Sequence, residues 1–140
     1  MLKIIFYVAT IMGLEITKEV VVTPQLVYDE VELNFRETVA SGQGIRVTHN
    51  FRSGGKITQV MFHFPGGCNA LVSMKLMKDL RSFYPLQGYL ALNDATPVYY
   101  ANAEYYPREP LTVEMLNADE DNPHTVSCTV VIRYLRPSWW

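Results

Sequence analysis

The chain has 140 residues, of which 49% are hydrophobic, 12% aromatic and only 19% charged. This length normally makes one domain with a sizeable core. Its net charge of −2 and its scattered lysines and arginines give no basic footprint, so we expect no nucleic-acid partner. With so few charges, part of the surface must be neutral, rich in tyrosine or covered by a partner.

The first 14 residues form an apolar segment. Lys3 is followed by a run of mostly apolar residues that imitates a short signal peptide, but no small-residue cleavage site follows it. The run is also shorter than the roughly 20 residues that cross a bilayer, so we expect no membrane partner. We interpret residues 1–14 as a strand or arm that adds to the chain's own sheet or to a neighbour's.

Residues 15–136 are expected to form a single all-β domain. Apolar and polar residues alternate, as in residues 27–35 and 45–51, and turn residues interrupt these runs every eight to twelve positions. We predict eight to ten strands in an antiparallel β-sandwich with jelly-roll or Greek-key connections. Residues 79–88 are expected to be an irregular crossing or at most one helical turn, and residues 137–140 an aromatic C-terminal tail.

The stretch FHFPGGCNALV places Cys68 behind Pro-Gly-Gly. A nucleophilic cysteine needs access and a lowered pKa, supplied by a helix N-terminus or a cationic histidine. Period-two alternation after the glycines favours a strand instead, with Cys68, Ala70 and Val72 facing inward. We therefore expect a corner with a buried thiol and no catalytic residue. Cys128 also has inward parity, so a Cys68–Cys128 disulfide and two free thiols both stay open.

Metal-ligand patterns are weak. His49, His63 and His124 lie on separate predicted elements, without the spacing of a zinc pair. The acidic loop at Asp119–Asp121 has oxygens that suit calcium, but acidic turn residues also hydrogen-bond their own backbone. We predict no metal and no cofactor, and leave calcium at this loop as an open alternative.

Aromatic residues are the most informative feature of the sequence. Six of them form the adjacent pairs Tyr99–Tyr100, Tyr105–Tyr106 and Trp139–Trp140. Neighbours on a strand point to opposite faces, so at least one tyrosine of each tyrosine pair should leave the core. Exposed tyrosine and tryptophan are favoured at protein interfaces and also stack on sugars. An exposed Trp-Trp end would reduce solubility unless covered, so we expect a homo-oligomer. The predicted interface residues are Ile4, Phe6, Val8, Tyr99, Tyr100, Tyr105, Tyr106, Trp139 and Trp140.

Three stretches carry a family resemblance: KITQVMFHFPGGCNALVSMKL, YPLQGYLALND and LTVEMLNADEDNPHTVSCTVVI. They resemble small β-sandwich virion proteins of tailed phages and related prokaryotic viruses. In those proteins a Phe-Pro-x-Gly-Cys turn leads into a Leu-Val strand, and an Asn-x-Asp loop precedes a final His-Thr-Val strand. The similarity spans roughly residues 43–135 and brings no catalytic residues with it.

The resemblance implies a non-enzymatic capsid decoration (cement) or minor capsid protein. Such a protein would bind the major capsid protein or another virion protein, lie on the capsid surface, and be extracellular when assembled. The alternative is a carbohydrate-binding β-sandwich on a virion tail or cell surface, with a glycan partner. A small hydrolase that uses Cys68 is the third hypothesis.

Overall fold

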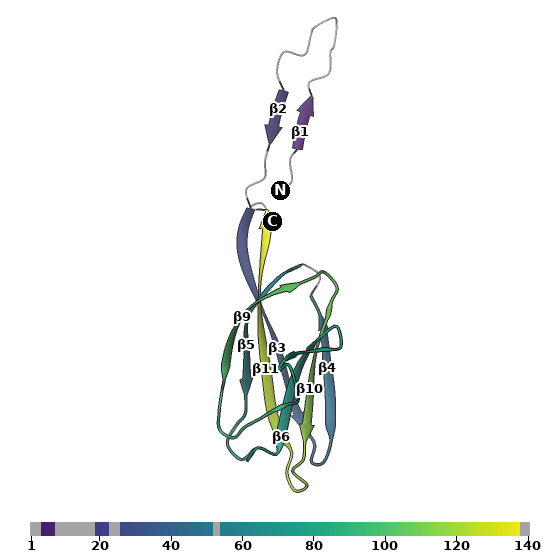
Figure 1. The fold of residues 1–140 in the computed structure, drawn as a ribbon, viewed down its shortest axis with the longest axis vertical. Helices are drawn as coiled ribbons and strands as arrows, with labels where there is room; N and C mark the ends of the chain where they lie inside the picture. The colour runs from purple at the N-terminus through teal and green to yellow at the C-terminus, as the bar shows by residue number, and fades with distance from the viewer. Residues whose placement is uncertain (1–3, 8–18, 23–25, 52–53, 138–140) are drawn as a thin grey trace, which may run out of the picture. The chain divides into compact units, whose positions relative to one another are not determined.

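The computed structural model describes residues 4–7, 19–22, 26–51 and 54–137 (Figure 1). The chain divides into two compact units, residues 1–29 with 135–140 and residues 30–134. The described residues form strands, turns and bends but no helix. Accordingly, none of them belongs to a helix that could cross a membrane.

Nine strands form two antiparallel sheets that pack face to face, which confirms the predicted all-β sandwich (Figure 1). The first sheet has the order β3–β11–β5–β9, and the second has the order β4–β10–β6–β7, with β8 also pairing with β6. Their bounds are β3 (Leu26–Val39), β4 (Gly44–Asn50), β5 (Gly55–His63), β6 (Val72–Lys78), β7 (Arg81–Tyr84), β8 (Leu90–Ala91), β9 (Val98–Tyr105), β10 (Pro110–Asn117) and β11 (His124–Pro137).

A two-stranded sheet lies in the N-terminal part of the chain. β1 (Ile4–Tyr7) pairs antiparallel with β2 (Glu19–Val22). The two strands form a sheet of their own.

The core lies between the two larger sheets. Val113 of β10 stands opposite Leu76 of β6, and Val130 of β11 stands opposite Val60 of β5. All four side chains are at most 1% exposed. Burying a side chain of this size stabilises the fold by about 1.5–3 kcal/mol. The apolar residues that alternate in the sequence therefore hold the two sheets together.

A bulge in β5 sets which residues face the core. Ile57 pairs with Ile132 and Gln59 with Val131, and the register shifts between them. One extra residue, Thr58, lies at this shift. A one-residue slip exchanges the two faces of a strand, so the bulge allows Ile57 and Val60 both to be buried although their spacing is odd. This explains why the segment is apolar at both parities.

Residues 79–88 differ from the prediction of an irregular crossing or helical turn. Arg81–Tyr84 form β7, which pairs with β6 through a tight reversal at Asp79 and Leu80. Both turn residues have positive φ, 51° and 61°. A two-residue hairpin turn with two positive φ angles is usually marked by Asn-Gly or Asp-Gly, so Asp-Leu gave no turn signal.

Ala70 also differs from its prediction, because it is exposed rather than inward. Asn69 and Ala70 both adopt positive φ, 50° and 58°, and β6 begins only at Val72. Alternation holds within a strand and cannot be counted back through a turn. The inward positions of Cys68 and Val72, both fully buried, are nevertheless as predicted.

We predict that Leu76→Ala lowers the free energy of unfolding by about 2–5 kcal/mol, because the fully buried side chain would leave a cavity. Leu86 is 78% exposed and offers a matched control. Leu86→Ala should change stability by about 0.5 kcal/mol or less. Urea unfolding followed by circular dichroism measures both, and equal losses would contradict the assigned core.

Candidate binding groove

Hydrogen bonds to the backbone and a glycine with positive φ hold the corner at Cys68 in its conformation. The Asn93 side-chain oxygen accepts hydrogen bonds from the backbone N–H groups of Gly67 and Asn69, at 3.0 and 2.9 Å. Gly67 adopts φ 97°, a region that glycine enters without strain. A strand follows the corner, so no helix N-terminus faces the thiol.

The two cysteines are free thiols, and both are fully buried. Burial raises the pKa of Cys68 and that of Cys128, because a thiolate is poorly solvated in an apolar interior. The corner therefore supplies neither the access nor the lowered pKa that a nucleophile requires.

Both thiols should resist alkylation in the folded protein. At about pH 8, iodoacetamide should leave Cys68 and Cys128 unmodified during a period in which the urea-unfolded chain is fully labelled. Leu86→Cys supplies an exposed thiol as a positive control. Mass spectrometry counts the adducts, and labelling of native Cys68 as fast as Cys introduced at Leu86 would contradict the buried corner.

The loop at Asp119–Asp121 was left open as a calcium site, but the carboxylate oxygens of Asp119 contact groups of the protein itself. One Asp119 oxygen accepts backbone N–H bonds from Asp121 and Asn122, at 2.9 and 3.2 Å. The other lies 2.7 Å from His124 Nε2. These contacts lower the pKa of Asp119, and the hydrogen bond with His124 has the largest effect. Among the described residues, no three or more His, Cys, Asp or Glu side chains gather as a metal site.

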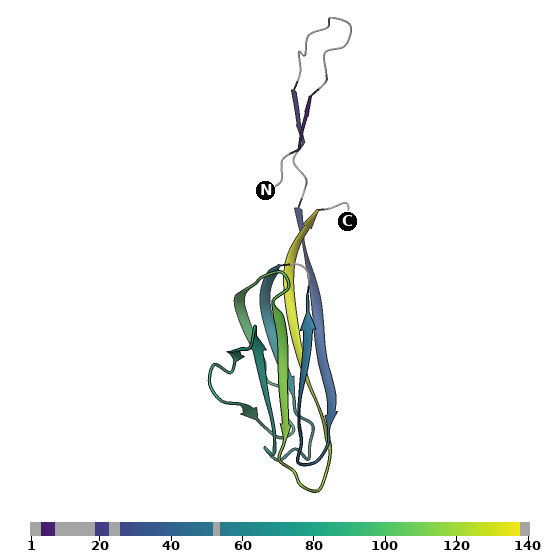
Figure 2. The ribbon, with the colours of Figure 1, turned by 90° about the vertical axis from the view of Figure 1, so that its right-hand side faces the viewer.

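A second polar cluster lies on the outer face of the β4–β10–β6 sheet. The register places Glu114 between Arg46 and Lys75. The Glu114 carboxylate accepts hydrogen bonds from the Tyr89 hydroxyl and, at 2.8 Å, from Arg46 Nε. The Lys75 ammonium lies 5.0 Å from the centre of the Tyr89 ring. This cluster fastens the β7–β8 segment, which stands out to the left in Figure 2, to the sheet.

The pKa of Glu114 is lowered from its ordinary 4.5, first by the Tyr89 hydroxyl and then by Arg46, against the opposing effect of burial. A carboxyl with a lower pKa in the folded chain stabilises the fold above its unfolded-state pKa. That stabilisation disappears as the pH falls through the folded value. The Glu114 contribution is therefore present above pH 4.5 and is lost in more acidic solution.

We predict that Glu114→Gln flattens the fall in stability on acidification below the ordinary glutamate pKa of 4.5. The variant has no carboxyl to protonate at this position, so it should lose less stability than the wild type over the same pH range. Tyr89→Phe removes the main cause of the lowered pKa and should flatten the curve partly. Thermal unfolding across this range measures the effect, and unchanged slopes in both variants would contradict the assignment.

The four predicted interface tyrosines differ in their exposure. Tyr100 and Tyr106 are 83% and 63% exposed, whereas Tyr105 is buried and Tyr99 is half-buried against the core. Each pair thus divides between the two faces, as neighbouring strand positions must. The four tyrosines therefore form no continuous platform for a sugar. Ile4 and Phe6 lie in β1, while Val8, Trp139 and Trp140 lie outside the described residues.

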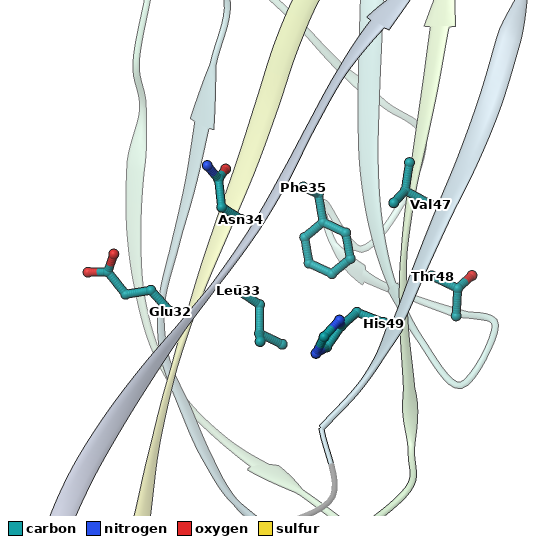
Figure 3. Close-up of a pocket in the computed structure, with 7 residues that line it drawn as sticks. All are labelled: Glu32, Leu33, Asn34, Phe35, Val47, Thr48 and His49. Carbon is teal, nitrogen blue, oxygen red and sulfur yellow. The ribbon is translucent and has the colours of Figure 1, made fainter.

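The histidines lie apart as predicted. His63 Nδ1 is 2.7 Å from Thr96 Oγ1, and His124 contacts Asp119. His49 faces the space between β3 and β4, where its ring meets Phe35 edge to face, with ring centres 6.4 Å apart (Figure 3).

This space is a groove of about 210 Å³ along one side of the sandwich, lined by Glu32, Leu33, Asn34, Phe35, Val47, Thr48 and His49. β3 is the end strand of one sheet and β4 the end strand of the other. Figure 3 shows Leu33, Phe35 and His49 pointing into the gap between the strands, while Glu32 and Asn34 point away from it. The groove therefore has an apolar floor and a polar rim.

On the β4 side of the groove the inward residues are less covered than those of the inner strands, whereas Leu33 and Phe35 of β3 are buried. Ile45 and Val47 of β4 are only half-buried, although they pair across the sheet with Met115 and Val113, which are fully buried. Apolar area thus stays accessible next to two strands that have no sheet neighbour on this side among the described strands. Sequence analysis missed this site, because periodicity does not tell which strands lie at the ends of sheets.

The side of the sandwich formed by β7 and β9 is closed differently. The rings of Tyr84 and Tyr99 lie with their centres 4.0 Å apart, and both contact Phe62. The Lys78 ammonium donates a hydrogen bond of 2.6 Å to the Glu104 carbonyl of β9. A hollow of about 270 Å³ also lies beside β7, lined by Lys78, Arg81, Ser82 and Phe83. The β3–β4 groove differs from it because end strands of both sheets line it.

No family model and no curated protein matches the chain. A search of solved structures finds the crystal structure of FlhE, with 15% sequence identity and a TM-score of 0.46, covering 76% of this chain and 96% of that one. The predicted capsid function is corrected on this comparison, because the structure found is FlhE and not a virion protein. A likeness of this size assigns no function in its place. The resemblance to phage proteins stays a prediction.

Proposed function

We propose that the chain is a non-enzymatic, protein-binding β-sandwich that takes up an extended segment of a partner along the β3–β4 groove. The observation that carries this proposal is the groove itself: an apolar floor between two end strands, with inward side chains such as Val47 left half-exposed. Free strand edges are templates for pairing with another chain.

Strand addition fits the chemistry of this side. Backbone groups of an added strand pair with the edge, and alternate side chains enter the pocket beside it. Leu33 and Phe35 on β3, and Val47 and His49 on β4, are each two residues apart. An extended segment repeats its side chains at the same spacing on one face, so small apolar residues at every second position suit the floor.

The charged residues of β3 favour particular residues on the outward face of the partner segment. β3 carries Glu30 and Glu32 at exposed positions, followed by Arg36, so an acidic residue of a partner strand beside the two glutamates would pair at a cost. A segment with lysine or neutral residues at its outward positions avoids that cost. The acidic part of β3 beside the groove therefore favours a partner segment with lysine or neutral residues at the facing positions.

A synthetic probe tests this proposal. A peptide of about eight residues that alternates valine with lysine should bind the full chain. Val47→Glu should weaken binding at least about tenfold, roughly 1.4 kcal/mol, because it places a charge on the floor. Glu32→Lys changes an exposed rim residue, leaves the core intact, and should also weaken binding. Isothermal titration calorimetry measures both variants.

Two controls make the result specific. Val98→Glu alters an exposed valine on β9 and should leave peptide affinity unchanged. N-methylation of alternate peptide bonds removes backbone donors and should abolish binding, because strand addition depends on them. Absence of peptide binding, or equal affinity for the Val47 and Val98 variants, would overturn the proposed function.

A further inference from the structure

A further hollow of about 350 Å³ lies beside the Glu114 cluster, lined by Gly44, Ile45, Arg46, Glu114 and Leu116. Among the described residues, none lines both this hollow and the β3–β4 groove. Proteins bind small ligands in hollows of roughly 300–1,000 Å³ that combine apolar surface with a few polar groups. The lining has this mixed character, with a cation, a carboxylate and an apolar side chain.

The Glu114 carboxylate holds Arg46 by its Nε. One carboxylate oxygen accepts the hydrogen bond of the Tyr89 hydroxyl and the other accepts that of Arg46 Nε, at 2.8 Å, so both oxygens have a donor. The side chain of Glu114 is 12% exposed, whereas that of Arg46 is 65% exposed. The buried carboxylate therefore orients the guanidinium while its terminal nitrogens stay accessible. Two such nitrogens can bind a planar anion through parallel hydrogen bonds.

The charges of the cluster favour an anion with a single charge. Glu114 stands directly opposite Arg46 on β4 and Lys75 on β6. The Tyr89 hydroxyl first, and then Arg46 and Lys75, lower the pKa of Glu114, so its carboxylate is ionised at neutral pH. Two cations then share one carboxylate, and the three side chains carry one net positive charge. A carboxylate matches this charge, whereas a doubly charged phosphate would meet more repulsion from Glu114.

Leu116 supplies the apolar part of the hollow. It is half-buried and stands directly opposite Gly44. A Cβ atom on Gly44 would lie 2.5 Å from Leu116 Cδ2, so the glycine allows the leucine to lie against β4. Leu116 is also two positions from Glu114, and alternate residues of a strand share a face. The apolar and charged parts of the hollow are therefore neighbours.

We propose that this hollow binds a small organic carboxylate with a short branched apolar group, the carboxylate on the terminal nitrogens of Arg46 and the apolar group on Leu116. Glu114 is then a positioning residue, because it acts through Arg46. A free short-chain acid and the C-terminus of a peptide that ends in leucine both have this chemistry. The site is independent of the proposed function, since the partner segment would lie in the β3–β4 groove.

Two pairs of probes test the site. Isovalerate carries the carboxylate as a free acid, and N-acetyl-alanyl-leucine carries it at a peptide end. Isovaleramide and the peptide amide are the matched neutral probes. At least one of the two acids should bind the full chain with a Kd of about 1 mM or lower, and its amide should bind at least about tenfold more weakly. Backbone amide shifts of Arg46, Glu114 and Leu116 in NMR titrations measure the affinity and locate the site.

Variants separate recognition from general effects of charge. Arg46→Gln should weaken binding of the acid at least about tenfold, because charged hydrogen bonds are lost. Arg81→Gln is the matched control, since Arg81 also lies near a carboxylate, 3.9 Å from Glu109, and lines the hollow beside β7. It should leave the affinity unchanged. Gly44→Ala keeps every charge but displaces Leu116, and should weaken binding too. Circular dichroism checks that each variant is folded.

The outcomes distinguish the two sources of the carboxylate. Binding of the peptide without isovalerate would assign the site to peptide ends, and binding of isovalerate at least as tight as the peptide would assign it to free acids. Equal affinity for acid and amide, tighter binding of inorganic phosphate, equal losses in the Arg46 and Arg81 variants, or no binding of either acid would overturn the proposal. The valine-lysine peptide, amidated at its C-terminus, should bind Arg46→Gln as it binds the wild type, so failure at the groove and failure here are distinguishable.

Discussion

The register between β5 and β11 is the constraint on which the rest of the sandwich depends. It is fixed where Ile57 pairs with Ile132 on one side of the bulge and Val60 with Val130 on the other. If the extra residue were removed, one end of β5 would turn its apolar side chains to solvent. β3 and β9 flank this ladder in the same sheet, so their pairing depends on it.

In the described part of the chain, polar side chains hold turns and strands in place. The Asn93 side chain holds the corner, Asp119 holds the turn before β11, and Glu114 ties a peripheral segment to the sheet. Within that part, no buried side-chain nitrogen or oxygen lacks a hydrogen-bond partner.

The sequence predicted the layers because inward residues repeat at every second position, as in Val126, Cys128 and Val130 of β11. It did not predict β7, whose turn at Asp79 and Leu80 lacks the usual glycine. The groove could not be predicted at all, since Val47 looks like any inward residue until the sheet order shows that β4 has a neighbour on one side only. Local pattern determines strands, whereas the location of binding surfaces is set by pairing between distant segments.

The lysine that caps the β9 edge has a consequence for growth of the sheet. Lys78 occupies the Glu104 carbonyl, and lysine at an edge discourages an incoming strand. β3, the end strand on the other side of the same sheet, borders the β3–β4 groove. Under the proposed function, strands would add at the β3 edge and not at the β9 edge, and this would give any assembly of these molecules a direction.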